Sequence, residues 1–132
     1  MLQGSCLCGT VRYELRGTPL AMYYCHCGTC RKASGSSFAT NLLVSADDFV
    51  VVAGREAIAA WESSPQKHRH FCSRCASPIY SQAEATRHVV SVRAGTLDGD
   101  PGTRPFAHAY VASKAPWYEI CDRVPQRPGA FA

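Results

Sequence analysis

Eight cysteines in a chain of 132 residues are the side chains best suited to chemistry. Seven of them fall into three short groups, which are Cys6 and Cys8; Cys25, Cys27 and Cys30; and Cys72 and Cys75. Such spacings are typical of thiolate ligands to a soft or borderline metal ion. A disulfide scaffold is less favoured, because the chain is long enough to bury a core and its first residues resemble no secretory signal. We therefore expect metal binding in a reducing cytoplasm.

The seven cysteines divide naturally into two zinc sites per chain. A structural zinc ion takes four protein ligands, whereas a working zinc ion keeps three and leaves the fourth position to water or substrate. We expect the two pairs to form a structural zinc site and the triplet to hold a second zinc ion at the reaction centre. The structural ligands are then Cys6, Cys8, Cys72 and Cys75, and the second, catalytic set is Cys25, Cys27 and Cys30.

Other divisions of the ligands stay open at this stage. A fourth ligand to the second ion could come from His26, His68, His70 or Cys121. Cys121 lies in an alternating segment, 117–121, which predicts a strand with a buried core thiol. Thiolates also accept iron, so spacing alone does not separate zinc from iron, nor does it show whether the second ion is retained.

A metal ion with one free position suits thiol chemistry. A free thiol has a pKa of about 8.5 and is mostly protonated at neutral pH, but a coordinated thiol loses its proton. Arg31 and Lys32 directly follow the third cysteine of the triplet. They are candidates to offset thiolate charge or to bind a substrate carboxylate, and a solvated basic pair is the equally weighted alternative.

Composition indicates one small globular domain. Hydrophobic residues make up 46% of the chain and charged residues 18%, which argues against disorder. The excess of 14 basic over 10 acidic residues is spread thinly, so we expect no nucleic-acid partner. No apolar run approaches the roughly 20 residues that a membrane-spanning helix needs, so we expect no membrane partner either.

Short segments with strand-like patterns are separated by turn signals, which favours an all-β sandwich or half-barrel. One helical turn is expected at 31–34, before Gly35. We expect no regular structure beyond residue 121, and the proline-rich tail should lie on the surface. The expected strands cover 10–15, 38–45, 49–53, 58–62, 67–71, 79–81, 88–94 and 107–111.

Four motifs together resemble the glutathione-dependent formaldehyde-activating enzyme family, which includes centromere protein V. They are Gly4-Ser5-Cys6-Leu7-Cys8-Gly9, Cys25-His26-Cys27-Gly28-Thr29-Cys30-Arg31-Lys32, Phe71-Cys72-Ser73-Arg74-Cys75 and Ser113-Lys114-Ala115-Pro116-Trp117-Tyr118-Glu119. The resemblance implies a mainly β, Mss4-like zinc-binding fold of packed antiparallel sheets, in a single domain over 1–132 with a core at about 4–121. One departure is Ala76, where the family commonly has glycine, and it matters only if that position needs positive φ.

The resemblance also implies a function. It assigns the structural zinc to Cys6, Cys8, Cys72 and Cys75, and the second zinc, with glutathione, to the triplet. The family's named activity is that of a carbon-sulfur lyase, which joins glutathione and formaldehyde into S-(hydroxymethyl)glutathione. Membership is broader than this activity, so a non-catalytic thiol-binding protein and a purely structural zinc protein remain the alternatives.

Overall fold

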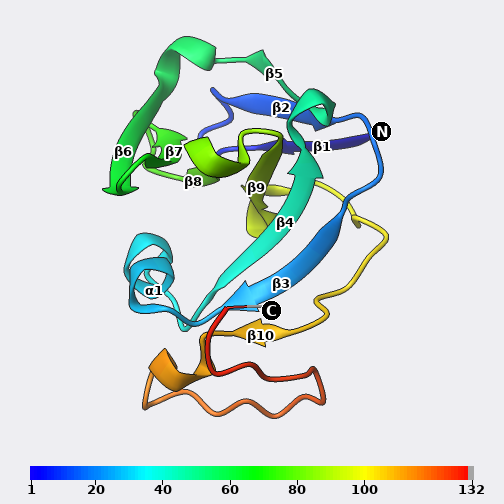
Figure 1. The fold of residues 1–132 in the computed structure, drawn as a ribbon. Helices are drawn as coiled ribbons and strands as arrows, with labels where there is room; N and C mark the ends of the chain where they lie inside the picture. The colour runs from blue at the N-terminus through cyan, green and yellow to red at the C-terminus, as the bar shows by residue number, and fades with distance from the viewer. Residues whose placement is uncertain (131–132) are drawn as a thin grey trace.

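The computed structural model describes residues 1–130, whose strands pair into two sheets (Figure 1). The smaller sheet has the order β1-β2-β5, with β1 at Leu2–Ser5, β2 at Arg12–Leu15 and β5 at Phe49–Ala53. The larger sheet has the order β10-β3-β4-β9-β8-β7-β6. Its strands are β3 (Ala21–Cys25), β4 (Ala39–Ser45), β6 (Ile58–Ser64), β7 (Lys67–Cys72), β8 (Pro78–Ala83), β9 (Val89–Arg93) and β10 (His108–Ala109).

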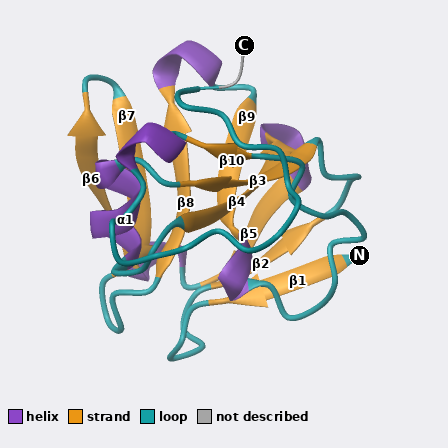
Figure 2. Cartoon of the chain, turned by 90° about the horizontal axis from the view of Figure 1, so that it is seen from below, coloured by secondary structure: helices purple, strands orange, loops and turns teal. Residues whose placement is uncertain are grey.

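The expected mainly β architecture is confirmed. Neighbouring strands are antiparallel except for β10 and β3, which run parallel at the edge of the larger sheet (Figure 2). The helical turn expected at 31–34 belongs to α1, Gly28–Ser34, which ends at Gly35 with φ of 63°. The turn signal at 45–48 forms a short 3-10 helix, Ala46–Asp48, and further 3-10 helices occupy Arg55–Ala57, Glu84–Thr86, Ala94–Thr96 and Val111–Ser113.

The larger sheet has one apolar and one polar face because side chains alternate along each strand. On the apolar face, Leu42 of β4 and Val92 of β9 are opposite each other and fully buried. They pack in one cluster with Tyr13 and Leu15 of the smaller sheet, which forms the core of the sandwich. The polar face of the same strands is therefore left free to build a site.

Two expectations about the C-terminal part of the chain are wrong. Within residues 1–130, no strand forms over 117–121, and the side chains of Trp117 and Cys121 are exposed. The physical reason is that alternation stabilises a strand only beside a sheet edge with free hydrogen-bonding groups. Here, the short edge strand β10 is already paired with β3 on one side and with the tail on the other.

The C-terminal tail, beyond residue 121, forms backbone hydrogen bonds that its composition does not predict. Its side chains are largely exposed, as expected, but its backbone follows the residues of β10 (Figure 1). His108 donates its N–H to the carbonyl of Pro125 at 2.8 Å, and Arg127 donates to the carbonyl of His108 at 2.8 Å. The tail expected over 122–132 includes residues 131 and 132, which lie outside the described residues.

Candidate metal centres and the adjoining cavity

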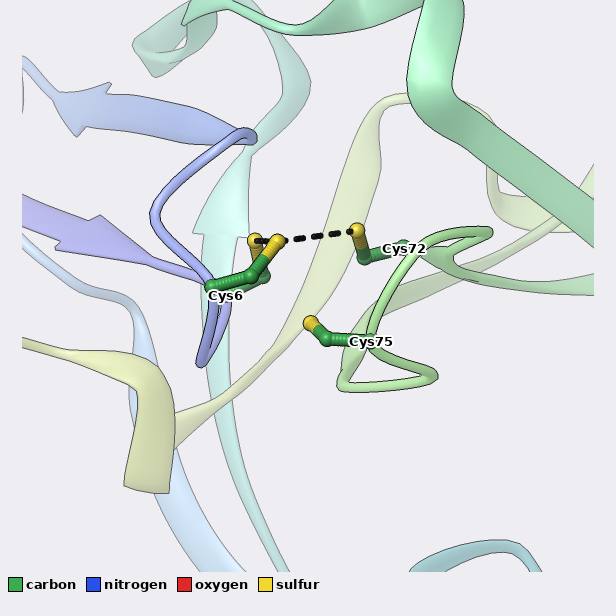
Figure 3. A group of neighbouring side chains, drawn as sticks. Cys6, Cys72 and Cys75 are labelled. Carbon is green, nitrogen blue, oxygen red and sulfur yellow. Dashed lines mark hydrogen bonds between the residues drawn. The ribbon is translucent and has the colours of Figure 1, made fainter.

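The first cluster, called here the four-cysteine cluster, brings together Cys6, Cys8, Cys72 and Cys75. Their sulfur atoms lie within 4.8 Å of one another, and the side chains converge from two separate loops (Figure 3). The sulfurs of Cys6 and Cys8 are 3.6 Å apart, and those of Cys8 and Cys72 are 3.9 Å apart. A tetrahedral zinc ion with bonds of about 2.3 Å places its sulfurs about 3.8 Å apart. The donor set therefore fits a closed zinc site, and all eight cysteines are free thiols rather than disulfides.

Polar neighbours hold the four-cysteine cluster in place. Val11 donates its N–H to the sulfur of Cys6 at 3.2 Å, and Ser77 Oγ lies 3.3 Å from the sulfur of Cys75. Hydrogen bonding with Ser77 lowers the pKa of Cys75 to about 5. A lowered pKa favours the thiolate, which is the form that binds a metal ion. Leu7 donates its N–H to Ser77 Oγ at 2.9 Å, which joins the two loops directly.

The second cluster, called the three-cysteine cluster, is built by the end of β3 and the start of α1. Cys25 is the last residue of β3, Cys27 caps α1, and Cys30 lies in its first turn. Cys30 donates its N–H to the sulfur of Cys27 at 3.2 Å, a capping bond that sets the direction of the helix. The three sulfurs lie within 4.8 Å of one another.

None of the alternative fourth ligands joins this group. Among residues 1–130, the histidine, cysteine, aspartate and glutamate donors within 4.8 Å of one another at this place are the three cysteines alone. His70 stacks on Tyr80 with ring centroids 4.1 Å apart, and His68 lies 3.8 Å from a carboxylate oxygen of Glu62. Cys121 is exposed. A zinc ion held by three protein donors has a fourth position for an outside ligand.

A cavity of about 370 Å³ adjoins the three-cysteine cluster, within the range of roughly 300–1,000 Å³ that small-molecule sites occupy. Its floor is the polar face of the larger sheet, where Asn41, Ser81 and Arg93 lie. Lys67, Arg69 and Arg93 line it, whereas no aspartate or glutamate among residues 1–130 does. Sequence reasoning missed these three basic residues. The available signal was a polar residue at alternate positions of an otherwise apolar strand, as in Val89-Val90-Ser91-Val92-Arg93.

A positively charged side chain of the cavity wall contacts the three-cysteine cluster. Arg69 directs Nη2 to the sulfur of Cys30 at 3.8 Å. Hydrogen bonding with Cys25, supported by Cys27 and Arg69, lowers the pKa of Cys30 to about 5. The sulfur of Cys30 therefore favours the thiolate form that binds a metal ion. Hydrogen bonding with Cys30, followed by burial, raises the pKa of Cys25.

The basic pair singled out from the sequence lies beside this cavity rather than in its lining. Lys32 faces a neighbouring depression together with Thr29, Trp61 and Arg69. Arg31 is not among the residues that line the cavity, and its Nε is buried without a partner. Their role in substrate binding stays a prediction.

His26 begins a buried chain of side chains behind the three-cysteine cluster. Its Nε2 lies 2.8 Å from Nδ1 of His108, whose Nε2 lies 3.0 Å from a carboxylate oxygen of Asp122. Both imidazoles are fully buried, and burial lowers the pKa of His26 to about 4. Phe38 and Tyr118 pack against the His26 ring at 5.0 and 6.2 Å. The neutral His26 thus packs within this buried chain, is not part of the donor group, and anchors the loop between two of its cysteines.

The fold and the two clusters define a class, namely a two-sheet β protein in which two sets of cysteines could each hold a metal ion. The family model described as glutathione-dependent formaldehyde-activating enzyme matches residues 1–113, and the chain belongs to this family.

Similar proteins agree with this assignment. A protein of Halomonas elongata, named provisionally for the same activity, is 35% identical over an alignment of 136 positions, which covers 96% of this chain and 85% of the relative. The crystal structure of a Rhodobacter sphaeroides protein has a TM-score of 0.64 at 23% identity and covers 78% of this chain and 97% of its own. This second likeness shows the fold alone.

Proposed function

We propose that the three-cysteine cluster binds zinc and that the protein combines glutathione, or a similar thiol, with formaldehyde. The observation that carries this proposal is a set of three sulfurs within 4.8 Å of one another at the wall of a cavity. No fourth donor from the described part of the chain belongs to the group. The four-cysteine cluster then holds the structural zinc ion. The family name and that of the Halomonas elongata relative support glutathione and formaldehyde as substrates.

The proposed reaction is that of a carbon-sulfur lyase, S-(hydroxymethyl)glutathione synthase. The thiolate sulfur attacks the carbonyl carbon, an S–C bond forms, and the carbonyl oxygen takes up the proton that the thiol released. The reverse step returns thiol and aldehyde. Bound zinc would lower the pKa of a coordinated thiol, so that the nucleophile is present at neutral pH.

The chain's own residues contribute charge and position. Arg69, 3.8 Å from Cys30, offsets the negative charge that three thiolates bring to one place. The walls of the cavity would hold thiol and aldehyde together, and such proximity contributes several kcal/mol when alignment is good. Among the described residues, no helix has the length and apolar character to cross a membrane. A cytoplasmic location remains part of the proposal.

A comparison of two cysteine variants tests the activity. Exchange NMR measures the rate of adduct formation in a mixture of glutathione and formaldehyde. Cys27→Ser should lose the protein's acceleration by more than about tenfold, because a metal ion supplies several kcal/mol of stabilisation in such sites. Cys121→Ser is the matched control, since Cys121 is exposed and belongs to neither cluster.

The outcomes separate the alternatives. If wild-type protein leaves the uncatalysed rate unchanged but binds glutathione, the protein is a thiol carrier. If the protein neither binds glutathione nor accelerates the reaction, and Cys27→Ser only lowers stability, the zinc ion of the three-cysteine cluster is structural. Elemental analysis of purified protein should find two zinc ions per chain, and one ion would restrict binding to a single cluster.

A further inference from the structure

The floor of the cavity carries a buried cation that has no anionic partner among the described residues. Arg93 is 8% exposed and lies on β9 directly opposite Asn41 of β4. Its Nη1 donates to Oδ1 of Asn41 at 2.6 Å and to Oγ of Ser91 at 3.2 Å, and its Nη2 donates to Oγ of Ser81 at 3.3 Å. These partners are neutral and hold the guanidinium in one orientation. Burying a charge without an opposite charge is costly, so the buried guanidinium favours an anion beside it.

Two more cations stand beside Arg93. Arg69 and Lys67 occupy alternate positions of β7, and both line the cavity. Nε and Nη1 of Arg69 are buried without hydrogen-bond partners. Buried donors of this kind are uncommon in native proteins and call for an explanation, of which a missing ligand is one.

The cavity also has an excess of positive charge, which favours an anionic ligand. Within residues 1–130, no carboxylate forms an ion pair with any of these three cations, and no acidic side chain lines the cavity. Three thiolates on a divalent ion would leave about one negative charge. That charge offsets only one of the three cations. Arg69 also connects these cations to the cluster, because its Nη2 lies 3.8 Å from the sulfur of Cys30.

We infer that Arg93 and Arg69, with Lys67 beside them, form a carboxylate-binding site that selects acidic thiols for the three-cysteine cluster. The inference rests on the proposed function, because it takes a thiol as the ligand of that cluster. Planar guanidinium groups match the geometry of a carboxylate and bind it through two parallel hydrogen bonds. A neutral thiol of the same size would leave the cations unpaired.

A matched pair of probes tests the inference by calorimetry on zinc-loaded protein. The probes are 3-mercaptopropionate and its methyl ester, which differ in the carboxylate charge. The acid should bind at least about tenfold more tightly, the amount that a hydrogen-bonded ion pair contributes. The thiol of the ester is the more acidic one, so any bias from thiol ionisation favours the ester and works against the expected result.

Two variants assign the preference to the named residues. Arg93→Lys keeps the positive charge but loses the planar guanidinium that donates two parallel hydrogen bonds. Arg69→Met removes the positive charge of a less buried side chain. Either variant should reduce the preference for the acid to less than about threefold. Arg104→Met is the control, because Arg104 pairs with Asp100 on an exposed loop and does not line the cavity. Circular dichroism and zinc content show which variants are folded and loaded.

The outcomes are distinct from those of the activity test. Equal affinities for acid and ester in wild-type protein overturn the inference, as does a preference that persists in both arginine variants. A preference that both variants lose supports it, even if the protein does not accelerate adduct formation. Conversely, acceleration without a preference for the acid would leave the proposed function standing and remove this inference.

Discussion

Ala76 shows how one side chain can work against the loop that holds it. It directly follows Cys75 and has φ of 64°, a left-handed conformation that costs a residue with a Cβ atom about 1–2 kcal/mol. The family resemblance predicted glycine at this position, and the backbone conformation supplies a physical reason for it, since the position does need positive φ. The loop keeps its form through the bond from the N–H of Ala76 to the carbonyl of Cys72, at 2.8 Å.

Ala76→Gly should therefore stabilise the protein by about 1 kcal/mol. This is the cost of the left-handed conformation for alanine, reduced by the larger conformational entropy that glycine gives to the unfolded chain. Denaturant unfolding at fixed zinc concentration measures the change. The reciprocal control is Gly35→Ala, because Gly35 has φ of 63° and an added Cβ would meet nothing within 4 Å. The free energy of unfolding of that variant should fall by a similar amount. A destabilised Ala76→Gly beside a destabilised Gly35→Ala would contradict this explanation.

At the scale of elements, the C-terminal segment is linked to the three-cysteine cluster through one carboxylate. Asp122 accepts from His108, which in turn contacts His26 between Cys25 and Cys27. Hydrogen bonding with His108, followed by the bond from the N–H of Val124, lowers the pKa of Asp122. A lowered folded-state pKa stabilises the fold above the unfolded value of about 3.9, and this contribution disappears as pH falls through the folded value.

Asp122→Asn should accordingly lower the free energy of unfolding at pH 7, and the gap to wild type should narrow as pH falls below about 4. Urea unfolding of both proteins at pH 7 and pH 3 gives the two differences. Glu56→Gln serves as control, since Glu56 is exposed and forms no ion pair with the described residues. A gap that stays constant across this range would show that Asp122 acts through packing rather than charge.

For the whole molecule, the four-cysteine cluster connects the two sheets of the sandwich. Cys6 and Cys8 follow β1 of the smaller sheet. In the larger sheet, Cys72 ends β7 and Cys75 lies in the turn that leads to β8. Zinc binding at such a site contributes directly to folding, because the unfolded chain holds no preformed ligand set. The three-cysteine cluster lies within one β3–α1 unit and makes no such connection.

Losing a ligand of the four-cysteine cluster should therefore lower stability more than losing a ligand of the three-cysteine cluster. Cys8→Ser should cost about 3 kcal/mol or more and lower Tm by about 10 °C, whereas Cys27→Ser should cost distinctly less. Calorimetry of both variants with matched zinc provides the comparison, and a chelator should bring wild-type protein close to the Cys8→Ser value. Equal losses in the two variants would refute the division into a structural and a working site.

The sequence by itself determined the features that depend on local spacing. Ligands two or three residues apart must share a loop, so the groups around Cys6, Cys25 and Cys72 follow from spacing alone. Alternation and turn residues likewise located most strands, because they act within a few positions. Cys121 shows the limit of this reasoning, since its alternating segment has no free sheet edge to join and its thiol is exposed.

Only the tertiary structure decided what surrounds the sulfurs. Arg69 and Arg93 are 24 positions apart and meet at one cavity because β7, β8 and β9 pair in a particular register. Asp122 reaches His26 only through His108, on a strand that runs parallel to β3. Register and strand order depend on the burial of the whole core, so no short window of sequence contains them.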